Sequence, residues 1–238
     1  MRVLGVLHTA DKPGVIRDTI RGLTLELSDP VGPRSGEVEF VEAHVKELML
    51  SRGSVRLGVE GERESYPKPS NPFERFKNQV QALTGKYPGL TVHPLEVKGK
   101  AGLVARVSSY LSDREALKAQ GRYAGELSPG AKMVVEEAER IPGYSVDKLI
   151  TALDAYRSAL MLDEGRREND DLIVMGGTHA QHVEGLGGGG QKILHSPLSL
   201  ARVTERTTGE QLRLYAEYKP AIDRGLEKFL REYGEPRA

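Results

Sequence analysis

The chain has 238 residues, of which 38% are hydrophobic and 29% are charged, and a chain of this length can bury a substantial core. Its 34 basic and 34 acidic residues cancel, so it lacks the excess of positive charge that is typical of nucleic-acid-binding proteins. It contains no Cys, which excludes disulfides, Cys-ligated metals and thiol catalysis. Any metal ligands must therefore be His, Asp or Glu.

The N-terminal residues MRVLGVLHTADK hold only a short apolar run before the first polar side chains. Such a run is too short for a signal peptide, and no other run approaches the ~20 apolar residues of a membrane span. We therefore expect a cytoplasmic protein that binds neither membranes nor nucleic acid. The high content of charged residues and the absence of Cys also suit an organism that grows at high temperature.

Short apolar runs rich in β-branched residues predict the strands. They cover residues 3–8, 23–28, 54–60, 90–97, 171–175 and 191–195. Most of them are nearly continuous rather than alternating, which is typical of parallel strands that are covered on both faces.

Segments with helical periodicity lie between these runs, at residues 13–21, 37–51, 72–83 and 103–120. Two successive helices follow, the first starting at Ser128-Pro129 and the second capped by Ser145. A last helical stretch covers residues 208–233 and is expected to restart at Pro220. This order predicts one α/β domain over residues 1–238, with a mostly parallel central sheet of about six strands flanked by helices. The two successive helices form an insertion before the fifth strand.

Histidines gather near the ends of the predicted strands. His8 ends the first strand, His179 follows the fifth and His195 closes the sixth, whereas His93 lies within the fourth and His44 within a helix. Ligands bind beyond the carboxyl ends of the strands in parallel α/β sheets, and His can act there as a general base or a metal ligand. We therefore interpret His44 as structural and the strand-end histidines as candidate site residues.

Two of these histidines share a Gly-x-x-His pattern. Gly5 precedes His8, and Gly176-Gly177-Thr178 precede His179. A glycine near a strand end lets a ligand or backbone approach closely, so Gly5, Gly176, Gly177 and His195 are candidate ligand-binding residues.

Two charged residues interrupt apolar patterns. Glu26 lies within the run LTLEL, and Arg157 lies beside the apolar stripe of the helix that Ser145 caps. A buried carboxylate must be paired, protonated or metal-bound. The two residues could form a structural ion pair, or they could act beside a catalytic His, where the guanidinium would hold an anionic intermediate.

The segment 185–190 (GLGGGG) is the one low-complexity patch. Consecutive backbone amides can bind phosphate, but this loop lacks the Gly-Lys-Ser/Thr ending and leads into a strand, whereas a P-loop leads into a helix. A connector or a closing loop is the favoured interpretation.

Together, Gly5-x-x-His8, Leu25-Glu26-Leu27, an Arg-bearing helix and Gly176-x-x-His179 resemble the TraB/Tiki group, whose superfamily includes erythromycin esterase and the haem-binding ChaN proteins. The similarity covers residues 2–30 and 150–190, and Arg166 or Arg167 is an alternative to Arg157 as the family arginine. The resemblance implies an α/β core and metal-dependent peptidase or esterase chemistry.

The leading hypothesis is a hydrolase with catalytic His8, Glu26, Arg157 and His179 acting on a small-molecule or peptide substrate. His8, Glu26 and His179 would hold a divalent metal ion that activates water, or the histidines would serve as general base and orienting residue. The alternative hypothesis is a non-enzymatic protein that binds a small anion or a haem-like ligand in the same cleft. A homo-oligomer is compatible with either hypothesis.

Overall fold

The computed structural model describes residues 1–6, 16–20, 23–27, 36–61, 72–96, 99–186, 191–200 and 205–234. Its centre is a parallel sheet of five strands in the order β5-β4-β6-β1-β7. The strands are β1 (Arg2–Val6), β4 (Val55–Val59), β5 (Leu90–Pro94), β6 (Leu172–Gly176) and β7 (Lys192–His195). Every neighbouring pair in this sheet is parallel, which confirms the predicted α/β class.

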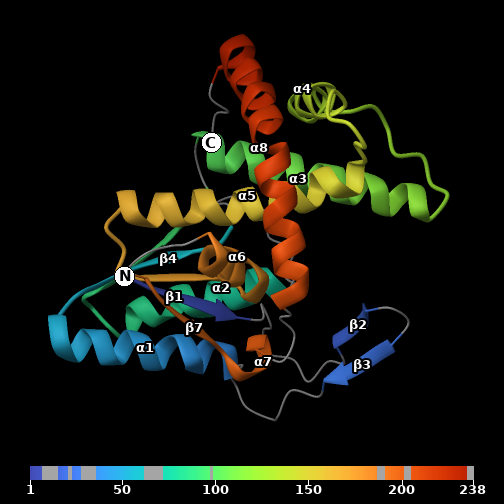
Figure 1. Cartoon of the computed structure of the whole chain (residues 1–238). Helices are drawn as coiled ribbons and strands as arrows, with labels where there is room; N and C mark the ends of the chain where they lie inside the picture. The colour runs from blue at the N-terminus through green and yellow to red at the C-terminus, as the bar shows by residue number, and fades with distance from the viewer. Residues whose placement is uncertain are drawn as a thin grey trace.

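Helices cover both faces of the sheet (Figure 1). The helices α1 (Gly36–Arg52) and α2 (Pro72–Ala82), the latter continued by the 3₁₀ turn η1 (Leu83–Gly85), pack on one face. The helices α5 (Val146–Arg167) and α6 (Gly177–Gly185) pack on the other. The alternation along β6 produces this division, since Leu172 and Val174 face α1 and α2, whereas Ile173 and Met175 face α5 and α6.

A second helical layer lies outside α5 and consists of α3 (Gly99–Ala119), α4 (Pro129–Ala138) and α8 (Glu205–Tyr233) (Figure 1). These helices share an apolar core with α5, in which Val104, Leu153 and Tyr218 are among the buried side chains. Because α5 contributes to this core and to the sheet core, it is buried on most of its circumference. The short helix α7 (Pro197–Leu200) follows β7.

Most of the predicted helices are confirmed. The side chain of Ser128 accepts from the N–H of Ala131 at the start of α4, and that of Ser145 accepts from the N–H of Lys148 at the start of α5. The helix α8 differs from its prediction, because it runs through Pro220 without restarting. Pro220 is exposed, so water can bond the carbonyl that a proline leaves unpaired.

The prediction is wrong for residues 16–27. Residues 16–20 form the strand β2 (Ile16–Ile20) instead of a helix, and β3 (Leu23–Leu27) pairs with it antiparallel in a separate two-stranded sheet. The run that contains Glu26 is therefore not a strand of the parallel sheet. Two residues separate β2 from β3, a length typical of β-hairpins.

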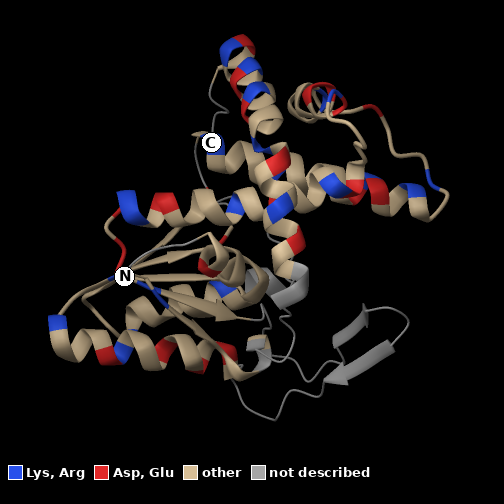
Figure 2. Cartoon of the chain, viewed as in Figure 1, with Lys and Arg blue, Asp and Glu red and all other residues tan. Residues whose placement is uncertain are grey.

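Acidic and basic side chains are interspersed along the described parts of α1 and α8 (Figure 2). Among the described helices, none combines the length and the apolar character that crossing a membrane requires.

The packing of α8 on α4 predicts opposite effects for two glycines of α8. A Cβ at Gly225 would lie 2.6 Å from the Cα of Val134 and 2.9 Å from the carbonyl oxygen of Met133, whereas a Cβ at Gly209 would meet nothing within 4 Å. We expect Gly225→Ala to lower the free energy of unfolding by about 1–3 kcal/mol through overpacking. Gly209→Ala, the matched control, should raise it by about 0.5–1 kcal/mol. Urea unfolding measures both, and an equal effect of the two changes would contradict the packing.

Candidate functional site

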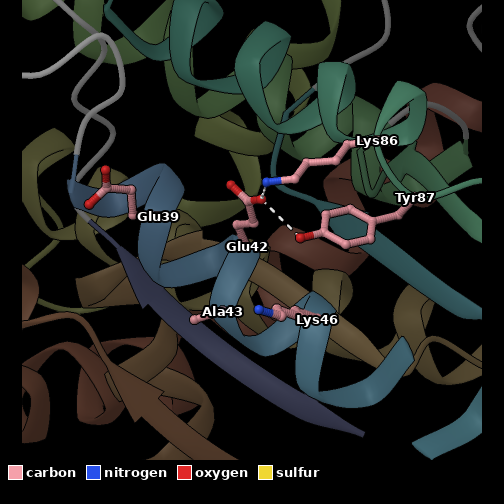
Figure 3. Close-up of a pocket in the computed structure, with 6 residues that line it drawn as sticks. All are labelled: Glu39, Glu42, Ala43, Lys46, Lys86 and Tyr87. Atoms are coloured by element: carbon pink, nitrogen blue, oxygen red, sulfur yellow. Dashed lines mark hydrogen bonds and ion pairs between the residues drawn. The ribbon is translucent and has the colours of Figure 1, made fainter. Parts of the chain in front are cut away.

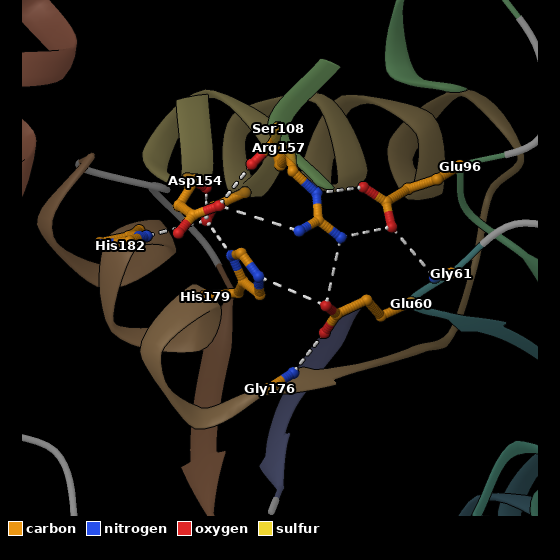
Figure 4. A network of polar contacts seen from close by, with 10 residues as sticks. Glu60, Gly61, Glu96, Ser108, Asp154, Arg157, Gly176, His179 and His182 are labelled. Carbon is orange, nitrogen blue, oxygen red and sulfur yellow. Dashed lines mark hydrogen bonds and ion pairs between the residues drawn. The ribbon is translucent and has the colours of Figure 1, made fainter. Parts of the chain in front are cut away.

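Charged side chains converge where β4, β5 and β6 end (Figure 4). Glu60 follows β4, Glu96 lies just beyond β5, and Gly176 ends β6, from which the chain passes directly into α6 with His179. Arg157 reaches them from α5. Because the strands are parallel, their carboxyl ends lie at one edge of the sheet, the edge at which such folds bind ligands.

Glu60 is at the centre of this cluster. Its Oε2 accepts a hydrogen bond of 2.6 Å from the backbone N–H of Gly176. Its Oε1 lies 3.3 Å from Nε2 of His179 and 3.5 Å from Nη2 of Arg157. Only 7% of the Glu60 side chain is exposed, so these groups supply the contacts that a buried carboxylate requires.

Glu96 holds Arg157 through two hydrogen bonds. Nε of Arg157 donates to Oε1 at 2.8 Å and Nη2 donates to Oε2 at 3.0 Å, a bidentate geometry that fixes the guanidinium plane. The N–H of Gly61 donates to Oε2 of Glu96 as well, at 3.1 Å. Burial lowers the pKa of Arg157, but Glu96 and Glu60 outweigh that effect and raise it above its ordinary value, so the guanidinium stays charged.

The remaining guanidinium nitrogen, Nη1, is differently placed. It lies 3.9 Å from Oδ1 of Asp154, which is beyond hydrogen-bond distance. The Arg157 side chain is 17% exposed. Nη1 can therefore donate to a negatively charged oxygen of a ligand, while Glu96 keeps the rest of the group in place.

Two histidines of α6 extend the cluster. Nδ1 of His179 and Nδ1 of His182 lie 2.8 Å and 2.9 Å from the hydroxyl oxygen of Ser158, and Nε2 of His182 lies 2.7 Å from Oε1 of Gln211. Burial lowers the pKa of His179, but the Glu60 carboxylate outweighs it and raises that pKa overall. Burial lowers the pKa of His182 to about 4, so His182 is neutral.

The structure brings together only part of the predicted site. Arg157, His179 and Gly176 lie in the cluster, and Gly177 is the buried first residue of α6. His8 lies outside the described residues, as does the side chain of Glu26. The prediction from the sequence missed Glu60 and Glu96 as site residues, although both lie within the runs 54–60 and 90–97 that the sequence predicts as strands.

Arg166 and Arg167, the alternatives to Arg157, are exposed at the end of α5. Arg166 contacts Gln191 and Asp163, and Arg167 contacts Glu164 and Glu168. Neither arginine has a contact with Glu60 or Glu96, so Arg157 is the arginine of the cluster.

Gly5 and His195 form a separate contact on β1 and β7. A Cβ at Gly5 would lie 2.5 Å from Nδ1 of His195 and 2.9 Å from Cβ of Ala180, so glycine leaves room for the imidazole ring. Nδ1 of His195 also lies 3.3 Å from the hydroxyl oxygen of Ser199. Burial lowers the pKa of His195. Packing against His195 and Ala180 therefore explains why residue 5 is a glycine.

The predicted metal site cannot be assembled from the described side chains. In that part of the chain no three His, Asp or Glu residues are grouped so as to hold a metal ion. Glu60 and His179 supply two donors, but the Oε1 atom that faces His179 also faces the Arg157 guanidinium, which repels a cation. A metal ion held by His8, Glu26 and His179 remains a prediction.

A surface pocket lies elsewhere, between α1 and the residues that precede β5 (Figure 3). Glu42 crosses it and accepts hydrogen bonds from Lys86 and from the Tyr87 hydroxyl. Among its lining residues Lys86 and Glu42 form an ion pair, and the pocket lacks the buried acid–base groups of the cluster.

Comparisons with protein-family models, with curated proteins and with solved structures found no match to the chain.

The buried Arg157–Glu96 pair predicts a large loss of stability when it is broken. Glu96 is 1% exposed, so Glu96→Ala should lower the free energy of unfolding by about 3 kcal/mol, because the buried guanidinium loses its main partner. Glu47→Ala is the matched control, since Glu47 forms a bidentate pair with Arg2 but is 59% exposed. It should cause little change. Comparable losses for the two variants would contradict the assigned role of Glu96.

His93 provides a prediction about pH. Nε2 of His93 lies 2.7 Å from Oδ1 of Asp170, whose side chain is fully buried, and this hydrogen bond raises the pKa of His93 despite the opposing effect of burial. The stabilisation from protonated His93 is complete below the pKa of the unfolded chain, about 6.5. It is lost as the pH rises through the higher pKa of the folded chain. The difference in unfolding free energy between the wild type and His93→Gln should therefore shrink from about pH 5.5 to about pH 8.5. A difference that grows over this range would refute the pairing.

Proposed function

We propose that Glu60, Arg157 and His179 form the active site of a hydrolase that cleaves an ester or amide bond with water. The observation that carries the proposal is the arrangement of the three groups. A carboxylate and an imidazole lie 3.3 Å apart beside a guanidinium whose Nη1 has no hydrogen-bond acceptor among the described residues.

Each group has a role in such a reaction. Glu60 takes a proton from the attacking water as its oxygen bonds to the carbonyl carbon, and Nη1 of Arg157 stabilises the resulting oxyanion. Protonated His179 gives its Nε2 proton to the leaving oxygen or nitrogen as the bond to the carbonyl carbon breaks. Glu60 then returns a proton to His179, which restores both residues.

The burial and the electrostatics support these roles. The Glu60 carboxylate raises the pKa of His179, which favours the imidazolium that a general acid requires. The His179 and Arg157 side chains are 12% and 17% exposed, so water and a substrate group can reach them. Glu96 is nearly inaccessible and acts by holding Arg157.

The resemblance to the TraB/Tiki group favours a peptidase or esterase. The resemblance rests on two Gly-x-x-His motifs, a Glu and an Arg-bearing helix, and the second of these motifs supplies both the Gly176 N–H that holds Glu60 and the His179 imidazole. No step of the proposed reaction passes through a metal ion.

The proposal predicts which substitutions abolish turnover. On a panel of nitrophenyl esters and fluorogenic peptides, His179→Asn and Glu60→Gln should each reduce kcat/KM by about 10²–10⁴-fold, because each removes a proton-transfer group. Arg157→Lys should reduce it by about 10²–10³-fold through the loss of oxyanion stabilisation.

The control for this series is His44→Asn, since His44 lies on α1, which packs on the opposite face of the sheet from α5. It should retain wild-type turnover. Equal turnover in all the variants would overturn the proposal. A small anion or haem-like ligand that co-purifies with a protein inactive on the whole panel would instead favour the binding-protein hypothesis.

A further inference from the structure

The Ser158 hydroxyl lies between the imidazole rings of His179 and His182. Its oxygen is 2.8 Å from Nδ1 of His179 and 2.9 Å from Nδ1 of His182. Ser158 and His182 are both fully buried, so water does not supply alternative partners. A serine hydroxyl has one proton and two lone pairs, and the hydrogen bonds on its two sides therefore depend on each other.

The surroundings of His182 determine the direction of these two hydrogen bonds. Its Nε2 faces the amide oxygen of Gln211 on α8 at 2.7 Å, so Nε2 carries a proton and donates it. Its other contacts are Ser158 on α5 and the His179 ring on α6, and no carboxylate touches it. A second proton on Nδ1 would place an uncompensated charge in a fully buried position. Nδ1 of His182 is therefore an acceptor and receives the Ser158 proton.

The competing acceptor for that proton is weaker. The carbonyl oxygen of Asp154 lies 3.0 Å from the Ser158 hydroxyl, but it also belongs to the i→i−4 ladder of α5, where it accepts the backbone N–H of residue 158. If the hydroxyl donated to this carbonyl, both imidazoles would have to donate to Ser158. That arrangement would make His182 cationic, which would place an uncompensated charge in a fully buried position.

We propose that Gln211, His182 and Ser158 are positioning residues that fix the proton of His179 on Nδ1. The Ser158 oxygen donates to His182 and so can only accept from His179. Nε2 of His179 is then the atom that exchanges protons with Glu60 and with substrate. This inference deepens the proposed hydrolase function and rests on it for its catalytic consequence, but the hydrogen-bond chain stands on the geometry alone.

The test is ¹⁵N–¹H NMR of the full chain labelled at His, recorded without substrate and assigned with His179→Asn and His182→Asn. Two-bond couplings show which ring nitrogen carries the proton. The wild type should show a proton on Nε2 of His182 and a proton retained on Nδ1 of His179. In Ser158→Ala, at a pH above the pKa of His179, the neutral His179 ring should lose the fixed Nδ1 proton and show averaged tautomers.

Ser108→Ala is the matched control, because Ser108 is also a buried serine and donates to Oδ1 of Asp154 at 2.9 Å without touching an imidazole. It should leave both tautomers as in the wild type. Gln211→Leu tests the other end of the hydrogen-bond chain, at a half-buried position. This substitution should abolish the preference of His182 for a proton on Nε2.

A wild-type His182 protonated on Nδ1, or a His179 tautomer that is unchanged in Ser158→Ala, would overturn the inference. Because these spectra need no turnover, the observed proton positions can contradict the inference in a protein that is an active hydrolase. Equally, the proton positions can be as expected in a protein that has no hydrolase activity. In an active protein, Ser158→Ala should lower kcat by about 10- to 100-fold with little change in KM.

Discussion

The bidentate contact between Arg157 and Glu96 is the constraint on which the rest of the site depends. The Arg157 side chain is only 17% exposed between a helix and the end of the sheet, so its charge needs a buried carboxylate partner. Glu96 supplies it from the end of β5, and the Gly61 N–H holds Glu96 from the end of β4. The contact therefore ties α5, which is shared by the sheet core and the outer helical core, to one edge of the sheet.

The contact between Arg157 and Glu96 also orients the Arg157 guanidinium relative to the other groups of the cluster. With Nε and Nη2 bonded to Glu96, the guanidinium plane is fixed and Nη1 lies 3.9 Å from Oδ1 of Asp154. The parallel order β5-β4-β6 brings Glu60 and the start of α6 beside it. The direct passage from β6 into α6 lets the Gly176 N–H and the His179 ring meet the same carboxylate. The proposed chemistry and the stability of the fold thus depend on the same set of charges.

The sequence predicted the fold better than it predicted the site. Continuous apolar runs and the serine caps at Ser128 and Ser145 are local signals, and they located the strands of the parallel sheet and most of the helices. Strand-end position also singled out His179, and an interrupted apolar stripe singled out Arg157. Their partners depend on which strands are neighbours, and strand order is set by long-range packing. Glu60 and Glu96 were therefore missed in favour of Glu26, whose strand belongs to a hairpin.

The proposed hydrolase function requires that Nη1 of Arg157 binds an anionic oxygen in addition to balancing buried charge. Calorimetric titration with an aryl methylphosphonate, whose tetrahedral anionic centre is similar to the intermediate of ester hydrolysis, tests it most directly. The wild type should bind this ligand, and Arg157→Lys, which keeps the charge but loses the planar donor geometry, should bind it at least about 10-fold more weakly. Equal binding to both proteins, or no binding to the wild type, would contradict it.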